Sequence, residues 1–409
     1  MDRSASIARA GVVGSGTMGG GIAMAYANAG IQVTLLDAEG AALERGLGII
    51  AKNYRRSVER GRLDPAEAEA RIARITGTLE IGDLAGSDIV TEAIFEDMVA
   101  KLDLVRRLDD VLAPGAIIAS NTSTLDIDQI AAASRHPARV LGMHYFSPAN
   151  VMKLLEVVRG KATSAEVVAR AAGIGRLLGK VPVVVGVCFG FVGNRMLFAR
   201  AAQSERMLLE GATPSQNDAA LTAFGFPMGQ HAMMDLSGLD VEWRIRQPRG
   251  EVRPVSDALV AMGRHGQKSG AGFYRYAPGG REALADPEVE ALCRRLGAEL
   301  GHRPRGFTGA ELLERQLYPL VNEGIRILEE GIADSAGDID TIWRHGYGWP
   351  ADKTGPMAWA ETIGAPALVA ALDRMAEETG DETLRPAESL RRAAAAGGRI
   401  FEDPKGGAA

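Results

Sequence analysis

The fold of the N-terminal half is decided by one short stretch, Gly14-Ser15-Gly16-Thr17-Met18-Gly19. It follows an apolar run at 10–13 and precedes a small-residue apolar segment at 22–29. In such a G-x-G-x-x-G turn, the first glycine permits the tight turn, the second lets a pyrophosphate approach the backbone, and the third lets helix and strand pack closely. The following helix would present its N–H groups to the phosphates. The stretch predicts a dinucleotide-binding turn, although a chain with 50 glycines also produces such matches by accident.

The residues that follow continue an alternation of strand and helix. Apolar strand-like runs occur at 31–36, 88–91, 116–119, 140–143, 154–158 and 181–185. Helical patterns at 97–112 and 165–178 lie between several of them. This alternation predicts a Rossmann-type α/β domain over residues 1–188, with a mostly parallel sheet and helices on both faces. Asp37 closes the second strand, where a carboxylate can bind a ribose hydroxyl and would repel a 2′-phosphate, so we expect NAD rather than NADP.

The C-terminal half is helical and contains an internal repeat. The segment 195–211 reads RMLFARAAQSERMLLEG, and 315–331 reads RQLYPLVNEGIRILEEG. The two copies converge again at FGFP (224–227) and YGWP (347–350). Two copies are too few for a solenoid, so we expect two repeated all-α domains, 189–285 and 303–395. Asn194 aligns with Glu314, so any function of Asn194 would be confined to the first copy and the second copy would serve as structure.

A histidine and a buried acid form the first candidate for chemistry. His144 follows the strand-like run 140–143, at the carboxyl edge where open α/β sheets bind ligands. Glu156 lies twelve positions later, inside the next apolar run, where a lone carboxylate should have a partner. A carboxylate on one imidazole nitrogen leaves the other free to act as a base. A structural histidine with an unrelated glutamate is the alternative.

Two further polar groups follow predicted strands. Residues 120–124 read Ser-Asn-Thr-Ser-Thr, which suits hydrogen bonding to a substrate or cofactor, or alternatively the N-cap of a helix starting near 126. Glu92, Glu96 and Lys101 follow the run 88–91, and a solvated helix start with a Glu–Lys pair is the alternative there.

Composition excludes several classes of protein. The 409 residues carry a formal net charge of −6 without a charged tail, so nothing indicates a nucleic-acid or membrane-surface partner. The two cysteines, Cys188 and Cys293, fit a reducing compartment, and no apolar run has the length of a membrane span or the form of a signal peptide. Histidines and cysteines do not cluster, so we expect no metal site. Arginine outnumbers lysine and glycine occurs 50 times, which is typical of a GC-rich bacterial coding sequence, and we expect a cytoplasmic bacterial protein.

Taken together, these motifs resemble the 3-hydroxyacyl-CoA dehydrogenase family over residues 8–392. The motifs that carry the resemblance are GSGTMGGGIA, EAIFEDMVAK, SNTSTLDI, HYFSPANVMKLLEV, CFGFVGNRML, FGFPMG, GQKSGAGFYRY and HGYGWP. The chain is most similar to the dehydrogenase half of the bifunctional members of the family. The resemblance implies NAD-dependent oxidation of (S)-3-hydroxyacyl-CoA to 3-oxoacyl-CoA, as in fatty-acid β-oxidation.

The resemblance also implies roles for individual residues. The family's catalytic pair falls on His144 and Glu156, and its substrate-positioning residues fall on Ser123 and Asn194. The cofactor contacts implied in this way are Gly14, Gly16, Thr17, Met18, Gly19, Asp37, Glu96, Lys101, Ser123, Ser147 and Lys268. Many relatives have asparagine where this chain has Ser147, and we expect that difference to tune a cofactor contact without loss of activity.

The resemblance bears on assembly as well. Relatives with one helical domain dimerise through it, so we expect a monomer in which the second copy replaces that partner. Only about seven residues precede the first predicted strand, so we expect no hydratase domain and allow for a separate enoyl-CoA hydratase partner. Two other interpretations stay open. One is a related dehydrogenase of a free hydroxy acid, such as gulonate or carnitine, and the other is a non-catalytic NAD-binding descendant.

Overall fold

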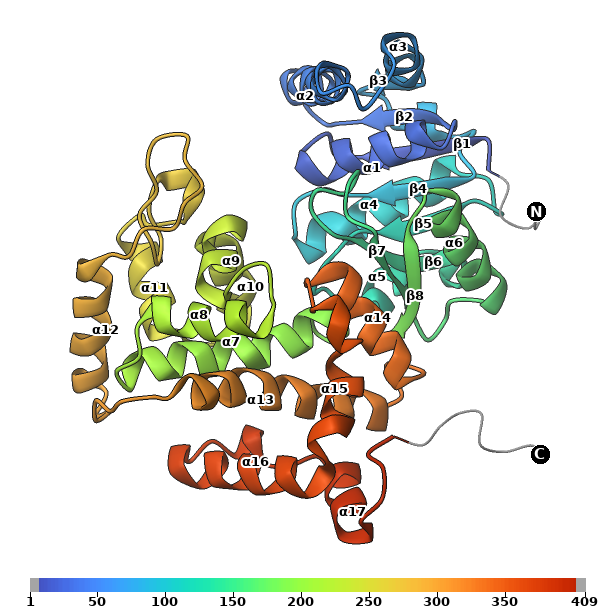
Figure 1. Cartoon of the computed structure of the whole chain (residues 1–409). Coiled ribbons are helices and arrows are strands. Elements are labelled where there is room, and N and C mark those ends of the chain that lie inside the picture. The colour runs from blue at the N-terminus through green and yellow to red at the C-terminus, as the bar shows by residue number, and fades with distance from the viewer. Residues whose placement is uncertain (1–6, 402–409) are drawn as a thin grey trace. The chain divides into compact units, whose positions relative to one another are not determined.

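An eight-stranded sheet forms the centre of the first of two structural units (Figure 1). The computed structural model describes residues 7–401. The first unit comprises Met1–Val192 and Gly331–Gly346, and the second comprises Gly193–Glu330 and Tyr347–Ala409.

The sheet has the strand order β3-β2-β1-β4-β5-β6-β7-β8. Its strands are β1 (Arg9–Val13), β2 (Gln32–Leu36), β3 (Ile75–Thr78), β4 (Ile89–Glu92), β5 (Ile117–Ser120), β6 (Val140–Tyr145), β7 (Leu154–Arg159) and β8 (Val181–Gly186). All neighbouring strands pair in parallel except β6 and β7, which are antiparallel. The chain therefore doubles back once, between 145 and 154, and this reversal sets the geometry of the candidate site.

Helices of the first unit pack along this sheet. They are α1 (Thr17–Asn28), α2 (Gly40–Glu59), α3 (Pro65–Ala73), α4 (Met98–Val111), α5 (Ile127–Ala132), α6 (Ala165–Leu177) and α14 (Ala336–Gly346). On α2, the buried positions Leu43, Gly46, Ile50 and Tyr54 recur every three or four residues, which places one apolar stripe toward the core. The side chain of Asp97 caps α4 by accepting the N–H of Ala100.

The predicted Rossmann-type fold is confirmed, and one strand was missed. Strand β3 (ITGT) is short and half polar, and it lies at the edge of the sheet, so it lacks the apolar run that marks a central strand. The apolar runs at 10–13, 31–36, 88–91, 116–119, 140–143, 154–158 and 181–185 all lie on strands of the sheet, with ends that differ by one or two residues.

In its described residues, the regular elements of the second unit are helices, apart from isolated bridges. Its α-helices are α7 (Gly193–Leu209), α8 (Pro214–Phe224), α9 (Gln230–Ser237), α10 (Leu239–Arg246), α11 (Pro254–Ala261), α12 (Pro287–Glu299), α13 (Gly309–Glu329), α15 (Pro356–Ile363), α16 (Ala365–Thr379) and α17 (Glu388–Ala396). Helices α7 and α13, which contain the repeated sequences, pack against each other. Helix α14, which sequence analysis includes in the second copy, contacts β7 and β8 and belongs to the first unit.

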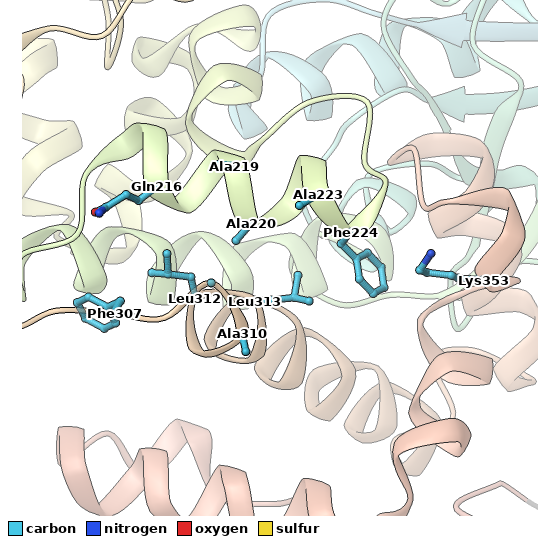
Figure 2. A pocket seen from close by; sticks show the side chains of 11 residues that line it. Gln216, Ala219, Ala220, Ala223, Phe224, Phe307, Ala310, Leu312, Leu313 and Lys353 are labelled. Carbon is cyan, nitrogen blue, oxygen red and sulfur yellow. The ribbon is translucent and has the colours of Figure 1, made fainter.

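Between α8 and α13 the second unit has an open apolar groove of about 660 Å³ (Figure 2). Ala219, Ala220, Leu312 and Leu313 line it, and Lys353 lies at the end near Phe224. None of the predicted site residues lines this groove. Within residues 7–401, no helix has both the length and the apolar composition needed to cross a membrane.

Candidate active site

The glycine turn at 14–19 joins β1 to α1 and opens onto a pocket of about 650 Å³. Gly14 has a φ of +96°, and a Cβ on it would lie 2.6 Å from the carbonyl oxygen of Ala93. A Cβ on Gly19 would lie 1.7 Å from the carbonyl oxygen of Gly14. A Cβ on Gly16, by contrast, would point into open space, which is the room that phosphates need. Thr17 and Met18 line the same pocket at the N-terminus of α1.

Asp37 follows β2 and is tied to the glycine turn. Its Oδ2 accepts hydrogen bonds from the backbone N–H of Ser15 at 2.8 Å and from the Ser15 hydroxyl at 2.5 Å. Partial burial acts to raise the pKa of Asp37, but these hydrogen bonds outweigh it and hold the pKa below its ordinary value. The side chain is therefore a carboxylate on the wall of the pocket, which suits a ribose hydroxyl and repels a 2′-phosphate.

His144 and Glu156 lie directly opposite each other on the antiparallel strands β6 and β7. The Nδ1 atom of His144 is 2.7 Å from Oε2 of Glu156. The histidine is 6% exposed and the glutamate is fully buried. With Nδ1 donating its proton to Glu156, the Nε2 atom of the imidazole would be left to accept a proton. The rings of Phe146 and Phe191 lie 4.5 and 5.7 Å from the imidazole ring and restrict its orientation.

A buried chain of charges begins where β4 ends. Glu92 is fully buried and Lys101 is 1% exposed. The Lys101 Nζ atom lies 2.8 Å from both carboxylate oxygens of Glu92 and 3.4 Å from Oε2 of Glu96. Ser120, the neighbour of Glu92 on β5, also donates its hydroxyl to that carboxylate. Glu92 and Lys101 therefore form a buried ion pair, unlike the solvated Glu–Lys pair considered as an alternative, and Glu96, whose side chain is 32% exposed, approaches this pair from the surface.

Glu96 connects these charges to Ser123. Its Oε1 accepts hydrogen bonds from the backbone N–H of Ser123 at 2.9 Å, from the Ser123 hydroxyl at 3.3 Å and from the Thr122 hydroxyl at 2.6 Å. Burial acts to raise the pKa of Glu96, but the charge of Lys101 and the hydrogen bonds hold the pKa below its ordinary value. The helix cap considered for this segment is provided by Asp126, which caps α5.

Ser147, Asn194 and Lys268 are the remaining predicted site residues. Ser147 is exposed in the segment that follows β6. Asn194, at the start of α7, and Lys268 belong to the second unit. Lys268 forms an ion pair with Asp240 in that unit. The side-chain oxygen of Asn194 accepts a hydrogen bond from the Tyr347 hydroxyl.

Ser15 and Tyr347 are not among the predicted site residues, although each contacts one of them. Ser15 lies inside the glycine motif, where the pattern leaves its position unspecified. Tyr347 differs from its repeat counterpart Phe224 by a hydroxyl, and that difference was the available signal. In the described part of the chain, no three His, Cys, Asp or Glu side chains are grouped so that they could hold a metal ion.

Comparison with protein families agrees with this geometry. Residues 9–188 match the NAD binding domain of 3-hydroxyacyl-CoA dehydrogenase. Residues 190–276 and 312–402 both match the C-terminal domain of the same family. The cofactor predicted from the glycine turn and Asp37 is thereby confirmed as NAD, and the helical C-terminal region is confirmed as one that matches the C-terminal domain of the family. Its division into two repeated domains, 189–285 and 303–395, stays a prediction.

Individual relatives give the same result. The chain is 40% identical over 411 residues to a peroxisomal bifunctional enzyme from Danio rerio, covering 96% of this chain and 56% of that protein. It is 37% identical to the fatty acid oxidation complex subunit alpha of Shewanella amazonensis, covering 97% of this chain and 56% of that subunit. The chain thus spans about half the length of these relatives. A 3-hydroxybutyryl-CoA dehydrogenase structure from Escherichia coli superposes with a TM-score of 0.82 at 29% identity, covering 96% of this chain and 99% of that one.

Proposed function

Because the chain belongs to the 3-hydroxyacyl-CoA dehydrogenase family, we propose that it oxidises (S)-3-hydroxyacyl-CoA to 3-oxoacyl-CoA with NAD. The observation that carries this proposal is the buried pair of His144 and Glu156, whose Nδ1 and Oε2 atoms are 2.7 Å apart. A protein that only bound NAD would have no need for an imidazole held in this way, since a carboxylate on Nδ1 prepares Nε2 to accept a proton.

In the proposed reaction, Nε2 of His144 accepts the proton of the substrate's 3-hydroxyl while the C3–H bond breaks and the C3–O double bond forms. Glu156 keeps the imidazole in the required tautomer and balances the positive charge that develops on it. NAD, when bound, supplies the acceptor for the hydride that leaves C3. We assign to Ser123 and Asn194 the hydrogen bonds to the oxygen on C3, first as a hydroxyl and then as a carbonyl.

The direct test is NADH formation from (S)-3-hydroxybutyryl-CoA and from a long-chain homologue, with wild-type protein and with His144→Ala. We expect turnover of at least one thioester by the wild type and its loss in the variant. The ratio of the two rates reports the acyl chain length. Free hydroxy acids such as gulonate and carnitine form the comparison panel. If they react while both thioesters do not, the CoA-dependent function is wrong.

We also propose that the protein is a monomer, because α7 and α13, the equivalent helices of the two copies, already pack against each other within one chain. Sedimentation equilibrium should give the mass of one chain, and a dimer mass would contradict the proposal. The name of the bifunctional relative supports the proposal of an enoyl-CoA hydratase partner. The low cysteine content of the chain and the match to a bacterial subunit support a bacterial cytoplasmic location in fatty-acid β-oxidation.

A further inference from the structure

A hydroxyl from the second helical copy forms a hydrogen bond with the side-chain amide of Asn194. Tyr347 lies in the YGWP motif of the second copy, and Asn194 is the second residue of α7 in the first copy. The hydroxyl of Tyr347 donates a hydrogen bond to Oδ1 of Asn194 at 2.8 Å. The tyrosine ring also lies against Gly193, where a Cβ would come within 2.4 Å of the Tyr347 hydroxyl. Glycine at 193 is therefore what allows the ring to approach the start of α7.

The position of Tyr347 is fixed by a reciprocal contact between the two repeat motifs. A Cβ on Gly225 of FGFP would lie 3.0 Å from Pro350 of YGWP. A Cβ on Gly348 of YGWP would lie 2.9 Å from Pro227 of FGFP. Both glycines have positive φ values, +119° and +68°. Each motif thus uses its glycine to receive the proline of the other, and this interlock holds Tyr347 beside α7.

The aromatic residues of the two motifs strengthen this interlock. Trp349 is 2% exposed and packs edge-on against Phe224 and Phe226, with ring centroids 5.5 and 5.4 Å apart. Edge-to-face contacts of buried rings restrict rotation of the segment that carries them. The Tyr347 hydroxyl therefore approaches Asn194 from a rigid support.

A side-chain amide has distinct donor and acceptor ends. Its oxygen accepts hydrogen bonds, and its nitrogen donates two. A hydroxyl that donates to Oδ1 selects one of the two orientations of the amide and leaves both Nδ2 hydrogens for another acceptor. We propose that Tyr347 is a positioning residue that orients Asn194 so that Nδ2 donates to the oxygen on C3 of the substrate. This inference rests on the proposed function, in which Asn194 binds that oxygen.

The repeat supports a specific role for Tyr347, because the pair of Asn194 and Tyr347 has no equivalent at the corresponding positions of the two copies. The counterparts of Asn194 and Tyr347 are Glu314 and Phe224, which have neither the amide nor the hydroxyl. Glu314 is instead 3.4 Å from Arg374 in an ion pair. The expectation that the second copy serves only as structure is therefore incomplete, since it also completes the support of a site residue in the first copy.

The test uses Tyr347→Phe, which removes the hydroxyl and keeps the ring. Tyr318→Phe is the matched control, because it removes a tyrosine hydroxyl elsewhere in the same unit. We expect Tyr347→Phe to lower kcat about five- to tenfold, which is the effect of one neutral hydrogen bond, while KM for NAD and the melting temperature stay near wild-type values. In an Asn194→Ala background, Tyr347→Phe should have no further effect on kcat, because the group it orients is absent.

Four outcomes would overturn the inference. Equal losses of kcat in the wild-type and Asn194→Ala backgrounds would mean that Tyr347 does not act through Asn194. Parallel losses of kcat, cofactor binding and melting temperature would indicate a structural role. An active wild type with an unaffected Tyr347→Phe variant would remove this inference and leave the proposed function intact, whereas a wild type that turns over no 3-hydroxyacyl-CoA would remove both.

Discussion

His144 and Glu156 face each other across the only antiparallel pair of strands in the sheet, with Nδ1 and Oε2 2.7 Å apart. Both residues belong to strands, so the backbone ladder of β6 and β7 sets their separation without help from a loop. A base held by the sheet needs little reorganisation before it accepts a proton, which favours catalysis. The reversal of the chain between these strands is therefore the feature that creates the pair.

Substitutions of His144 and Glu156 should separate the effect of the imidazole on kcat from that of the carboxylate charge. We expect His144→Ala to lower kcat by several orders of magnitude because no base remains, with the fold retained. Glu156→Gln keeps an acceptor for the Nδ1 proton but removes the negative charge, so we expect a smaller loss of about 10²- to 10⁴-fold. Initial-rate kinetics with a 3-hydroxyacyl-CoA and circular dichroism check both expectations. His136→Ala, at an exposed histidine, is the control and should keep full activity.

A second prediction concerns the choice of cofactor. Asp37→Ala removes the carboxylate that lines the dinucleotide pocket, so we expect NAD to bind about ten- to a hundredfold more weakly while the KM for acyl-CoA changes little. Discrimination against NADP should also fall, because the repulsion of a 2′-phosphate is lost. Glu39→Gln is the control, since it removes an exposed charge two residues away. Fluorescence titration with NAD and with NADP gives the ratio of the two affinities. An unchanged NAD affinity would contradict the assignment of Asp37.

Sequence patterns predicted those parts of the fold and site that depend on local chemistry. The glycine turn and Asp37 could be predicted because each position has its own steric or electrostatic requirement. The pairing of His144 and Glu156 could be predicted because an acid in an apolar run needs a partner. The chain also had to reverse between these two residues.

Other features depend on contacts between distant segments and could not be predicted. Helix α14 packs on β7 and β8, although its sequence continues the second copy without interruption. Lys101 is buried between two carboxylates, whereas its sequence pattern is that of an exposed helix start. The role of Tyr347 depends on a contact 153 positions away in the sequence. No local periodicity reports such pairings.

The buried charges beside Ser123 lead to a prediction about pH. The charge of Lys101 lowers the pKa of Glu96 against the opposing effect of burial, so Lys101→Met should raise it. Because an ionised Glu96 accepts the hydrogen bonds of Ser123 more strongly than a protonated one, we expect the acidic limb of the kcat/KM profile to move to higher pH.

The variant also leaves Glu92 as an unpaired buried charge, which costs about 3–5 kcal/mol of stability. The double variant Glu92→Gln/Lys101→Met removes both charges and should recover much of that stability while keeping the shifted acidic limb. An acidic limb that stays in place in a folded double variant would argue against the link between Lys101 and Glu96.

Lys180 gives a prediction about stability at alkaline pH. Its Nζ atom donates hydrogen bonds to the backbone carbonyl of Ala149 and, at 2.7 Å, to that of Met152. Burial lowers the pKa of Lys180 from 10.5 to about 8 in the folded protein. Between these two values the unfolded chain binds more protons than the folded chain at this group, so its contribution to the free energy of unfolding must rise with pH.

Replacing Lys180 by methionine should remove this increase in the free energy of unfolding with pH. We expect the difference in free energy of unfolding between the wild type and Lys180→Met to grow in favour of the wild type as the pH increases from about 8 to 10.5. Urea denaturation of both proteins at several pH values measures this difference in the free energy of unfolding. Lys161→Met, at a side chain that is 93% exposed, is the control and should show no such trend. A constant or falling difference for Lys180→Met would mean that the folded protein keeps this lysine protonated, because a group with the same pKa in both states makes stability independent of pH.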